Sequence, residues 1–297
     1  MARRIGGGGV LGELLAASHL CDFDHIPTLV ARHAAAENLL DVRIYLADRQ
    51  QHVLRLFGEG PDWSPDEGQL DIDTTLAGLA FREIDIVGPY RTTAEAAAGE
   101  PYRYWVPMLD GTERMGVLEV RSPYPSADIK ERLTALATLV ALLIVSKRSH
   151  SDTYARVTRT RRMSLAAEVQ WQLLPPLAFG NDRAVVAAAL EPAYEVGGDA
   201  FSYALSGRTL YLSIFDAMGH DTSAGLTASI AIASLRSGRR SGIGLAEISM
   251  RIQDDVVAQF DGERYVTGIL SHIDLDTGEL TWVNRGHPPP MLLRGGR

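Results

Sequence analysis

The chain has 297 residues, of which 46% are hydrophobic and 22% are charged, and it is long enough for two folded domains. The net charge of −8 argues against broad electrostatic binding to nucleic acid or to an anionic membrane. The single cysteine, Cys21, excludes a disulfide framework and a multi-cysteine zinc site within one chain, and it fits a reducing compartment. We therefore expect a cytoplasmic protein that binds neither nucleic acid nor membrane.

The first part of the chain predicts a mixed domain of helices and antiparallel strands. Residues 1–10 contain four consecutive glycines and are interpreted as a flexible tail. The apolar run at 133–145 is shorter than the roughly 20 residues that a membrane-spanning helix needs. Residues 11–146 therefore predict an α+β sensor-like domain, with helices at 11–20, 26–40, 75–81 and 126–146 and strands at 42–46, 53–56, 84–87, 102–108 and 115–120.

A linker over residues 147–174 is predicted to be helical. Apolar residues continue a heptad phase from the preceding helix, which is typical of a short parallel coiled coil. We therefore expect a homodimer formed through this linker helix. A cluster of four arginines at 156–162 has no interleaved aromatic residues, which favours a solvated face or an acidic partner over nucleic acid. The heptad residues are Leu133, Leu136, Val140, Leu143, Tyr154 and Val157.

Residues 175–297 predict a second α+β domain built around a β-hairpin. The helix at 165–174 must end at the following two prolines, and a strand at 185–190 comes next. Helices are predicted at 223–236 and 245–260, and a second hairpin at 265–273 and 280–284. The central hairpin comprises strands at 200–205 and 209–215 with Ser206-Gly207-Arg208 as the turn.

The turn of the central hairpin fixes which residues face each other. If Gly207 and Arg208 are the central residues of a type II′ turn, Ser206 pairs with Thr209. Counting back along both strands then places Asp199 opposite Asp216. Like charges in this position repel each other, so the pair predicts a divalent cation or a shared proton.

Two other interpretations of these acids stay open from the residues alone. Asp is a common turn residue, and each carboxylate on its own is explained as a loop cap. A register slip of one residue would move one carboxylate to the opposite face of the sheet.

Three segments of the first domain resemble pieces of a GAF domain. They are Leu76-Ala-Gly-Leu-Ala-Phe, Tyr104-Trp-Val-Pro-Met-Leu-Asp-Gly and Met115-Gly-Val-Leu-Glu-Val. The resemblance covers about residues 11–146 and implies a GAF-like sensor fold. GAF domains bind unrelated ligands or none, so the small-molecule or protein signal stays unassigned.

Four motifs, in order, resemble the SpoIIE/RsbU group of PPM (PP2C-like) serine/threonine phosphatases. They are Leu165-Ala-Ala-Glu-Val-Gln-Trp-Gln-Leu-Leu-Pro, Glu195-Val-Gly-Gly-Asp-Ala-Phe, Phe215-Asp-Ala-Met-Gly-His and Asn284-Arg-Gly-His-Pro-Pro-Pro. The resemblance implies an α-β-β-α sandwich that holds two Mn²⁺ or Mg²⁺ ions at one end. It also implies a phosphorylated anti-anti-sigma (STAS) protein as substrate.

The same resemblance implies roles for individual residues. Asp216 would bridge the two metal ions, the carbonyl of Ala217 would bind one of them, and Asp199 would bind metal directly or through water. His220 would act as an acid near the leaving oxygen or cap the following helix. His287 is expected to fix a tight loop rather than to touch substrate.

The chain departs from the group pattern at three points. Ser202 stands where a second Asp often follows Gly-Gly-Asp, and Asp221 stands where a Gly usually follows the His. The pattern also continues to a Thr-Asp-Gly segment and a final acidic stretch that this sequence does not contain. We therefore interpret the sequence as a phosphatase fragment truncated at its C-terminus.

Two further functions compete with a GAF-regulated phosphatase. A catalytically degenerate phosphatase that binds a partner as a scaffold is motivated by Ser202 and Asp221. A diguanylate cyclase is suggested only by a GAF domain followed by Gly-Gly-Asp. Ala200 replaces the acidic residue that the cyclase signature needs, so this last function is disfavoured.

Overall fold

The computed structural model describes residues 10–58, 64, 66–195 and 197–295. The chain divides into two compact units, Met1–Thr160 and Arg161–Arg297, and each has its own hydrophobic core. The predicted tail lies outside the described residues except for Val10, which opens the first helix.

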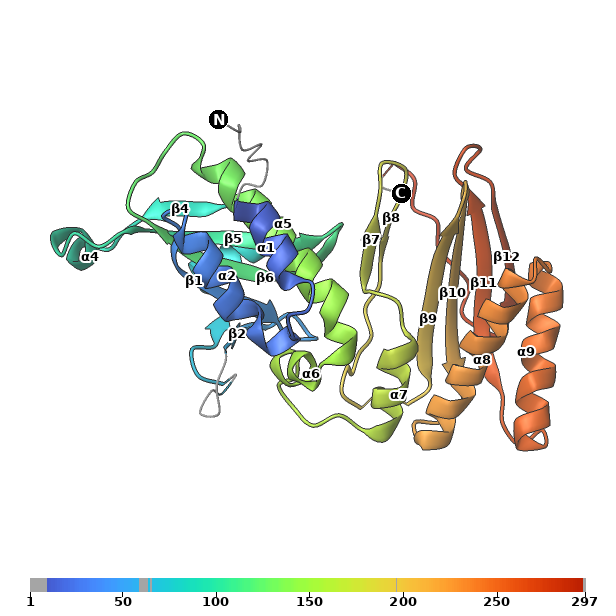
Figure 1. Cartoon of the computed structure of the whole chain (residues 1–297). Coiled ribbons are helices and arrows are strands. Elements are labelled where there is room, and N and C mark those ends of the chain that lie inside the picture. The colour runs from blue at the N-terminus through green and yellow to red at the C-terminus, as the bar shows by residue number, and fades with distance from the viewer. Residues whose placement is uncertain (1–9, 59–63, 65, 196, 296–297) are drawn as a thin grey trace, which may run out of the picture. The chain divides into compact units, whose positions relative to one another are not determined.

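A six-stranded antiparallel sheet forms the centre of the N-terminal unit (Figure 1). The strand order is β3-β2-β1-β6-β5-β4, so β1 and β6 are neighbours although they are far apart in the sequence. The predicted hairpin of two long strands forms β5 and β6. The strands are β1 (Leu40–Ala47), β2 (Val53–Phe57), β3 (Leu70–Asp71), β4 (Val87–Tyr90), β5 (Tyr102–Asp110) and β6 (Glu113–Ser122).

Helices cover both faces of this sheet. Side chains that alternate along β1 contribute to two separate cores, Ile44 and Leu46 to one and Tyr45 and Ala47 to the other. The larger core includes α1, α2, α5 and α6, and the smaller one includes α3. The mixed α+β class is therefore confirmed. The helices are α1 (Val10–Ser18), η1 (Phe23–His25), α2 (Ile26–Ala35), α3 (Leu76–Glu83), α4 (Thr93–Ala97), α5 (Ile129–Lys147), η2 (Arg148–His150) and α6 (Asp152–Thr158).

Backbone φ angles explain why a helix end and a strand start in this unit differ from the predicted positions. The helix predicted to reach residue 40 ends at Ala35, because Asn38 takes a left-handed φ of 59° before β1. The strand predicted at 84–87 begins only at Val87, because Ile84, with φ 56°, caps α3 in the left-handed region. Helix α4 was not predicted, although Thr92 and Glu95 form a capping box at its start.

The prediction of a continuous helical linker is wrong. Helix α5 ends at Lys147, α6 spans Asp152–Thr158, and α7 (Leu165–Leu173) begins only after a further break. The heptad residues Leu133, Leu136, Val140, Leu143 and Val157 are buried in the core of the N-terminal unit itself, and Tyr154 packs against it. These side chains are therefore not available as a coiled-coil seam for a second chain, because sheet and helices of the same unit cover them.

A four-stranded antiparallel sheet of order β12-β11-β10-β9 forms the centre of the C-terminal unit. Helices α8 and α9 pack on one face of this sheet, and α7 packs against α8 (Figure 1). The predicted strand at 185–190 is shorter, and it pairs with a strand that was not predicted. The remaining elements are β7 (Ala178–Gly180), β8 (Val185–Ala187), β9 (Asp199–Ser206), β10 (Thr209–Ala217), α8 (Thr222–Arg240), α9 (Leu245–Phe260), β11 (Val266–Asp274) and β12 (Leu280–Arg285).

Small residues allow α8 to pack closely against its neighbours. Ala224, Ala228 and Ala231 are fully buried along this helix. A side chain at Gly225 would place its Cβ 3.0 Å from the Cβ of Ala166 in α7. Helix α7 therefore lies directly against the start of α8.

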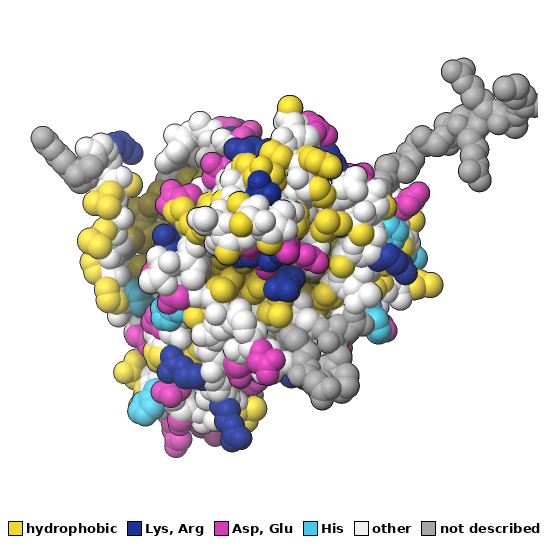
Figure 2. Space-filling model, turned by 90° about the vertical axis from the view of Figure 1, so that its left-hand side faces the viewer, with side chains coloured by type: hydrophobic (Ala, Val, Ile, Leu, Met, Phe, Trp, Pro, Cys, Tyr) yellow, Lys and Arg dark blue, Asp and Glu magenta, His cyan; other side chains and the backbone are white. Residues whose placement is uncertain are grey.

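Acidic, basic and hydrophobic side chains are interspersed on the face shown in Figure 2. This mixture is typical of a solvated protein surface. Among the helices of the described residues, none combines the length and the apolarity needed to cross a lipid bilayer.

A substitution pair in α5 tests whether the heptad residues form core or an interface between chains. Leu136 is 2% exposed and Leu142, on the same helix, is 53% exposed. We expect Leu136→Ala to lower the free energy of unfolding by about 2–5 kcal/mol, because it leaves a cavity. Leu142→Ala should change it by less than about 0.5 kcal/mol. Urea denaturation at several protein concentrations measures both. A midpoint for Leu136→Ala that recovers at high concentration would instead indicate a seam between chains.

Candidate functional site

The central hairpin has the turn and the register that the sequence predicts. Gly207 has a φ of 57°, and Arg208 does not have a positive φ, which are the signs that a type II′ turn requires. The pairing starts with Ser206 opposite Thr209 and continues without a shift to Asp199 opposite Asp216. The predicted position of the two acids is therefore confirmed.

The two acids occupy the closer kind of antiparallel pair. The main-chain N–H of Ala217 donates to the carbonyl of Gly198 at 3.0 Å. The adjacent pair of Asp199 and Asp216 is therefore a non-hydrogen-bonded pair, in which the Cα atoms are typically about 4.5 Å apart. Phe215 and Ala217 alternate with Asp216 and enter the helix-covered core, so both carboxylates lie on the other face.

The electrostatic cost of this arrangement appears in the pKa of Asp199. Partial burial raises the pKa of the Asp199 carboxyl above its ordinary value, and the charge of Asp216 raises it further. His287 acts in the opposite direction. Asp199 is exposed to solvent, yet the site disfavours two negative charges at once.

Two glycines allow the loop after β10 to pack against the start of β9. A Cβ at Gly197 would lie 2.4 Å from the Cα of His220. A Cβ at Gly198 would lie 2.3 Å from the carbonyl oxygen of Ala217. Any larger residue at either position would push this loop away, so the two glycines let the main chain of Ala217 and His220 lie against the residues that precede Asp199.

His220 does not cap the following helix. The N-cap of α8 is Asp221, whose side chain accepts from the main-chain N–H of Ala224 at 2.8 Å. Arg264 donates to the other carboxylate oxygen of Asp221 at 3.0 Å. These hydrogen bonds, led by the one from Ala224, lower the pKa of Asp221. The expectation that His220 caps the helix is therefore wrong, because the next residue has the better cap geometry.

His287 lies closer to the acid pair than the sequence suggested. Thr267 in β11 is paired with Asp216, and its hydroxyl lies 3.0 Å from Nδ1 of His287. Asn284 fixes the loop: its side-chain oxygen accepts from the N–H of His287, and its amide donates to the carbonyl of His287. His287 therefore lies in a fixed loop, as expected. The sequence did not predict that His287 lowers the pKa of Asp199, because this interaction depends on the pairing of β10 with β11.

Gln170 was not identified from the sequence as part of the site. This residue of α7 is 2% exposed, and its amide nitrogen donates to the main-chain carbonyl of Asp199 at 3.0 Å. Ser202, at the position of the expected second acid, is also buried in β9. Among the described residues there is no group of three or more His, Cys, Asp or Glu side chains arranged to hold a metal ion.

Part of the C-terminal unit is similar to a known protein family. Residues 206–297 match the family model "Stage II sporulation protein E (SpoIIE)". The matched range lies within the C-terminal unit. It includes Asp216, Ala217, His220 and His287, whereas Asp199 precedes it by a few residues.

Solved structures similar to the N-terminal part include several GAF domains. The GAF domain of an Acinetobacter phosphoenolpyruvate-protein phosphotransferase is 20% identical, with a TM-score of 0.39, and the match covers 48% of this chain and 94% of that chain. The corresponding domain from Coxiella burnetii is 16% identical, with a TM-score of 0.37 and coverages of 47% and 93%. The second GAF domain of DevS from Mycobacterium smegmatis is 18% identical, with a TM-score of 0.31 and coverages of 42% and 97%.

The raised pKa of Asp199 predicts a pH-dependent stability difference. In a solution with EDTA, Asp199→Asn should be more stable than the unchanged chain at pH 7, because it removes the repulsion and the desolvation of one charge. The folded chain binds a proton at Asp199 at a higher pH than the unfolded chain does. The advantage of the variant should therefore shrink as the pH falls through the folded pKa.

Thermal unfolding between pH 3 and 8 measures this difference. Asp254→Asn, at an exposed position on α9, removes one negative charge elsewhere in the unit and serves as the control. Equal behaviour of the two variants would contradict a repulsive acid pair.

Proposed function

We propose that the C-terminal unit is a metal-dependent phosphatase that acts on phosphorylated serine or threonine in a protein. The observation that carries this proposal is the pairing of Asp199 with Asp216 at the end of the hairpin. A divalent cation would relieve the repulsion between these two facing carboxylates, which contributes to the raised pKa of Asp199. The SpoIIE match over residues 206–297 supports the same chemistry.

The residues present fit a hard divalent cation in chemistry, although they supply few ligands. Mg²⁺ and Mn²⁺ prefer oxygen donors, and the carboxylates of Asp199 and Asp216 together with the carbonyl of Ala217 are of this kind. A cation held there would lower the pKa of a bound water and would neutralise phosphoryl oxygens. By the family pattern, the complete site takes two such ions.

The remaining side chains of the site would position these groups. Gln170 fixes the main chain of Asp199, and Thr267 fixes His287 beside the acid pair. The imidazole of His220, which is exposed after β10, would act as an acid near the leaving oxygen of the phosphoryl group.

The partners proposed for this activity follow from the family resemblance. The substrate would be a phosphorylated STAS-domain protein in a sigma-factor partner-switching pathway. The N-terminal unit would regulate the phosphatase in response to a small-molecule or protein signal. Its GAF-like motifs at 104–111 and 115–120 lie in the β5–β6 hairpin of the sheet.

A binding regulator without catalysis is the second candidate. It is favoured by the lack of a third metal-binding side chain among the described residues and by the buried Ser202 in place of an acid. Such a protein would retain its partner but would not hydrolyse the phosphoester.

A cation-binding and hydrolysis assay distinguishes the two candidates. Calorimetry should detect Mn²⁺ binding that Asp216→Asn weakens by about tenfold or more, because one charged ligand is lost. A version of the chain extended to the full family pattern should release phosphate from a phosphorylated STAS protein in the presence of Mn²⁺, and the same version with Asp216→Asn should not. Asp254→Asn serves as the control, since it removes a charge from α9 and leaves the hairpin intact.

Each result supports one candidate. Retained partner binding without hydrolysis, in the extended version and in its Asp216→Asn variant alike, would favour the regulator. Failure to bind Mn²⁺ at all would overturn the phosphatase proposal.

A further inference from the structure

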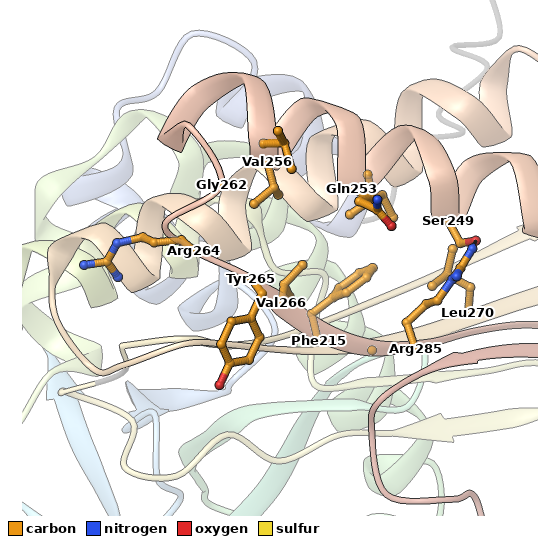
Figure 3. Close-up of a pocket in the computed structure, with 13 residues that line it drawn as sticks. Phe215, Ser249, Gln253, Val256, Gly262, Arg264, Tyr265, Val266, Leu270 and Arg285 are labelled. Atoms are coloured by element: carbon orange, nitrogen blue, oxygen red, sulfur yellow. Dashed lines mark hydrogen bonds between the residues drawn. The ribbon is translucent and has the colours of Figure 1, made fainter.

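A cavity of about 340 Å³ lies between α9 and the strands β11 and β12 (Figure 3). This volume is at the lower end of the range of about 300–1,000 Å³ that is common for small-molecule sites. Four apolar side chains form much of its wall: Phe215 in β10, Ile252 and Val256 in α9, and Leu270 in β11. The cavity is therefore suited to the apolar part of a small ligand.

Gly268 allows the ring of Phe215 to lie in this wall. A Cβ at Gly268 would be 2.7 Å from Cδ1 of Phe215 and 2.9 Å from the carbonyl oxygen of Ile214. Figure 3 shows the Phe215 ring directed from the strand toward α9. A larger residue at position 268 would displace the ring, so the shape of the cavity depends on this glycine.

The charged residues that line the cavity are all basic. Arg264 and Arg285 contribute to the wall, and no Asp or Glu is among the described residues that line it. The charge of Arg264 is compensated by Asp221, which accepts from it at 3.0 Å. The guanidinium of Arg264 also points away from the other lining side chains (Figure 3).

Arg285 is paired only with a neutral group within the described structure. Its Nε and Nη2 donate to the hydroxyl of Ser249 at 3.2 and 2.9 Å. The hydroxyl proton of Ser249 is donated to the carbonyl of Ala246 at 2.7 Å. The positive charge of Arg285 at this end of the cavity therefore has no carboxylate partner among the described residues.

We propose that this cavity binds a small amphipathic monocarboxylate. The carboxylate would accept from the guanidinium of Arg285, which suits such a group geometrically, and the hydrocarbon part would lie against Phe215, Ile252 and Val256. One uncompensated guanidinium matches a single negative charge, whereas a phosphate dianion would remain partly unpaired. The amide of Gln253, one turn from Ser249 on α9, offers a further hydrogen bond to the ligand.

This site is distinct from the acid pair but uses the same strands. Phe215 precedes Asp216 in β10, and Gly268 follows Thr267 in β11. The cavity lies on the helix-covered face of the sheet, and the acids lie on the opposite face. The proposal does not depend on phosphatase activity. Its failure would leave the acid pair untouched, and its success would not require a bound metal.

Titration calorimetry of the whole chain with octanoate tests the proposal, with octanol as the neutral probe of similar size. We expect saturable binding of octanoate and clearly weaker binding of octanol. Arg285→Gln should weaken the binding of octanoate by about tenfold or more, because a charge-assisted hydrogen bond is lost. Arg251→Gln removes the same charge from an exposed position on α9 that does not line the cavity, and it should bind octanoate like the unchanged chain.

A second variant tests the location independently of charge. Val257 lines the cavity and is 46% exposed, so Val257→Phe should partly fill the cavity without unfolding the unit. This variant should bind both octanoate and octanol more weakly than the unchanged chain does. Circular dichroism verifies that each variant is folded. Three results would overturn the proposal: no saturable binding, equal affinity of the Arg285 and Arg251 variants, or tighter binding of inorganic phosphate than of octanoate.

Discussion

The repulsion between two carboxylates on adjacent strands is the constraint on which the C-terminal unit depends. A non-hydrogen-bonded pair brings side chains closer together than any other pair in an antiparallel ladder. The sequence places Asp199 and Asp216 in such a pair, and the pKa of Asp199 is raised first by partial burial and then by the charge of Asp216. A fold that retains this unfavourable contact is expected to use it, because strained electrostatics concentrate at functional sites.

The surroundings of the pair are arranged to keep it in place. The glycines at 197 and 198 let the next loop approach closely, and Gln170 of α7 holds the main chain of Asp199. On the other side, Thr267 brings the imidazole of His287 into the same neighbourhood. Helix α7 begins at Leu165, and its Gln170 is hydrogen-bonded to the main chain of one of the two acids.

The two faces of the β10–β11 pair have different chemistry. Because side chains alternate along a strand, each acid-face residue has neighbours that enter the helix-covered core. Phe215 and Gly268 shape an apolar cavity on that second face, and Arg285 adds a charge without an acidic partner in the described structure. A ligand on one face would therefore contact the immediate neighbours of residues on the other.

The sequence alone determined the central hairpin and its register. A two-residue turn with glycine at its first position leaves one way to pair the strands, so local chemistry sufficed to place Asp199 opposite Asp216. Only the tertiary structure decided the roles of His287, Gln170 and the α5 heptad. His287 and Gln170 reach the site through contacts between distant segments, which no local pattern encodes. The spacing of Leu136 and Val140 suits both a coiled coil and a helix that packs on a sheet. Only the tertiary structure distinguishes these two arrangements, because it buries both residues in the core of the N-terminal unit.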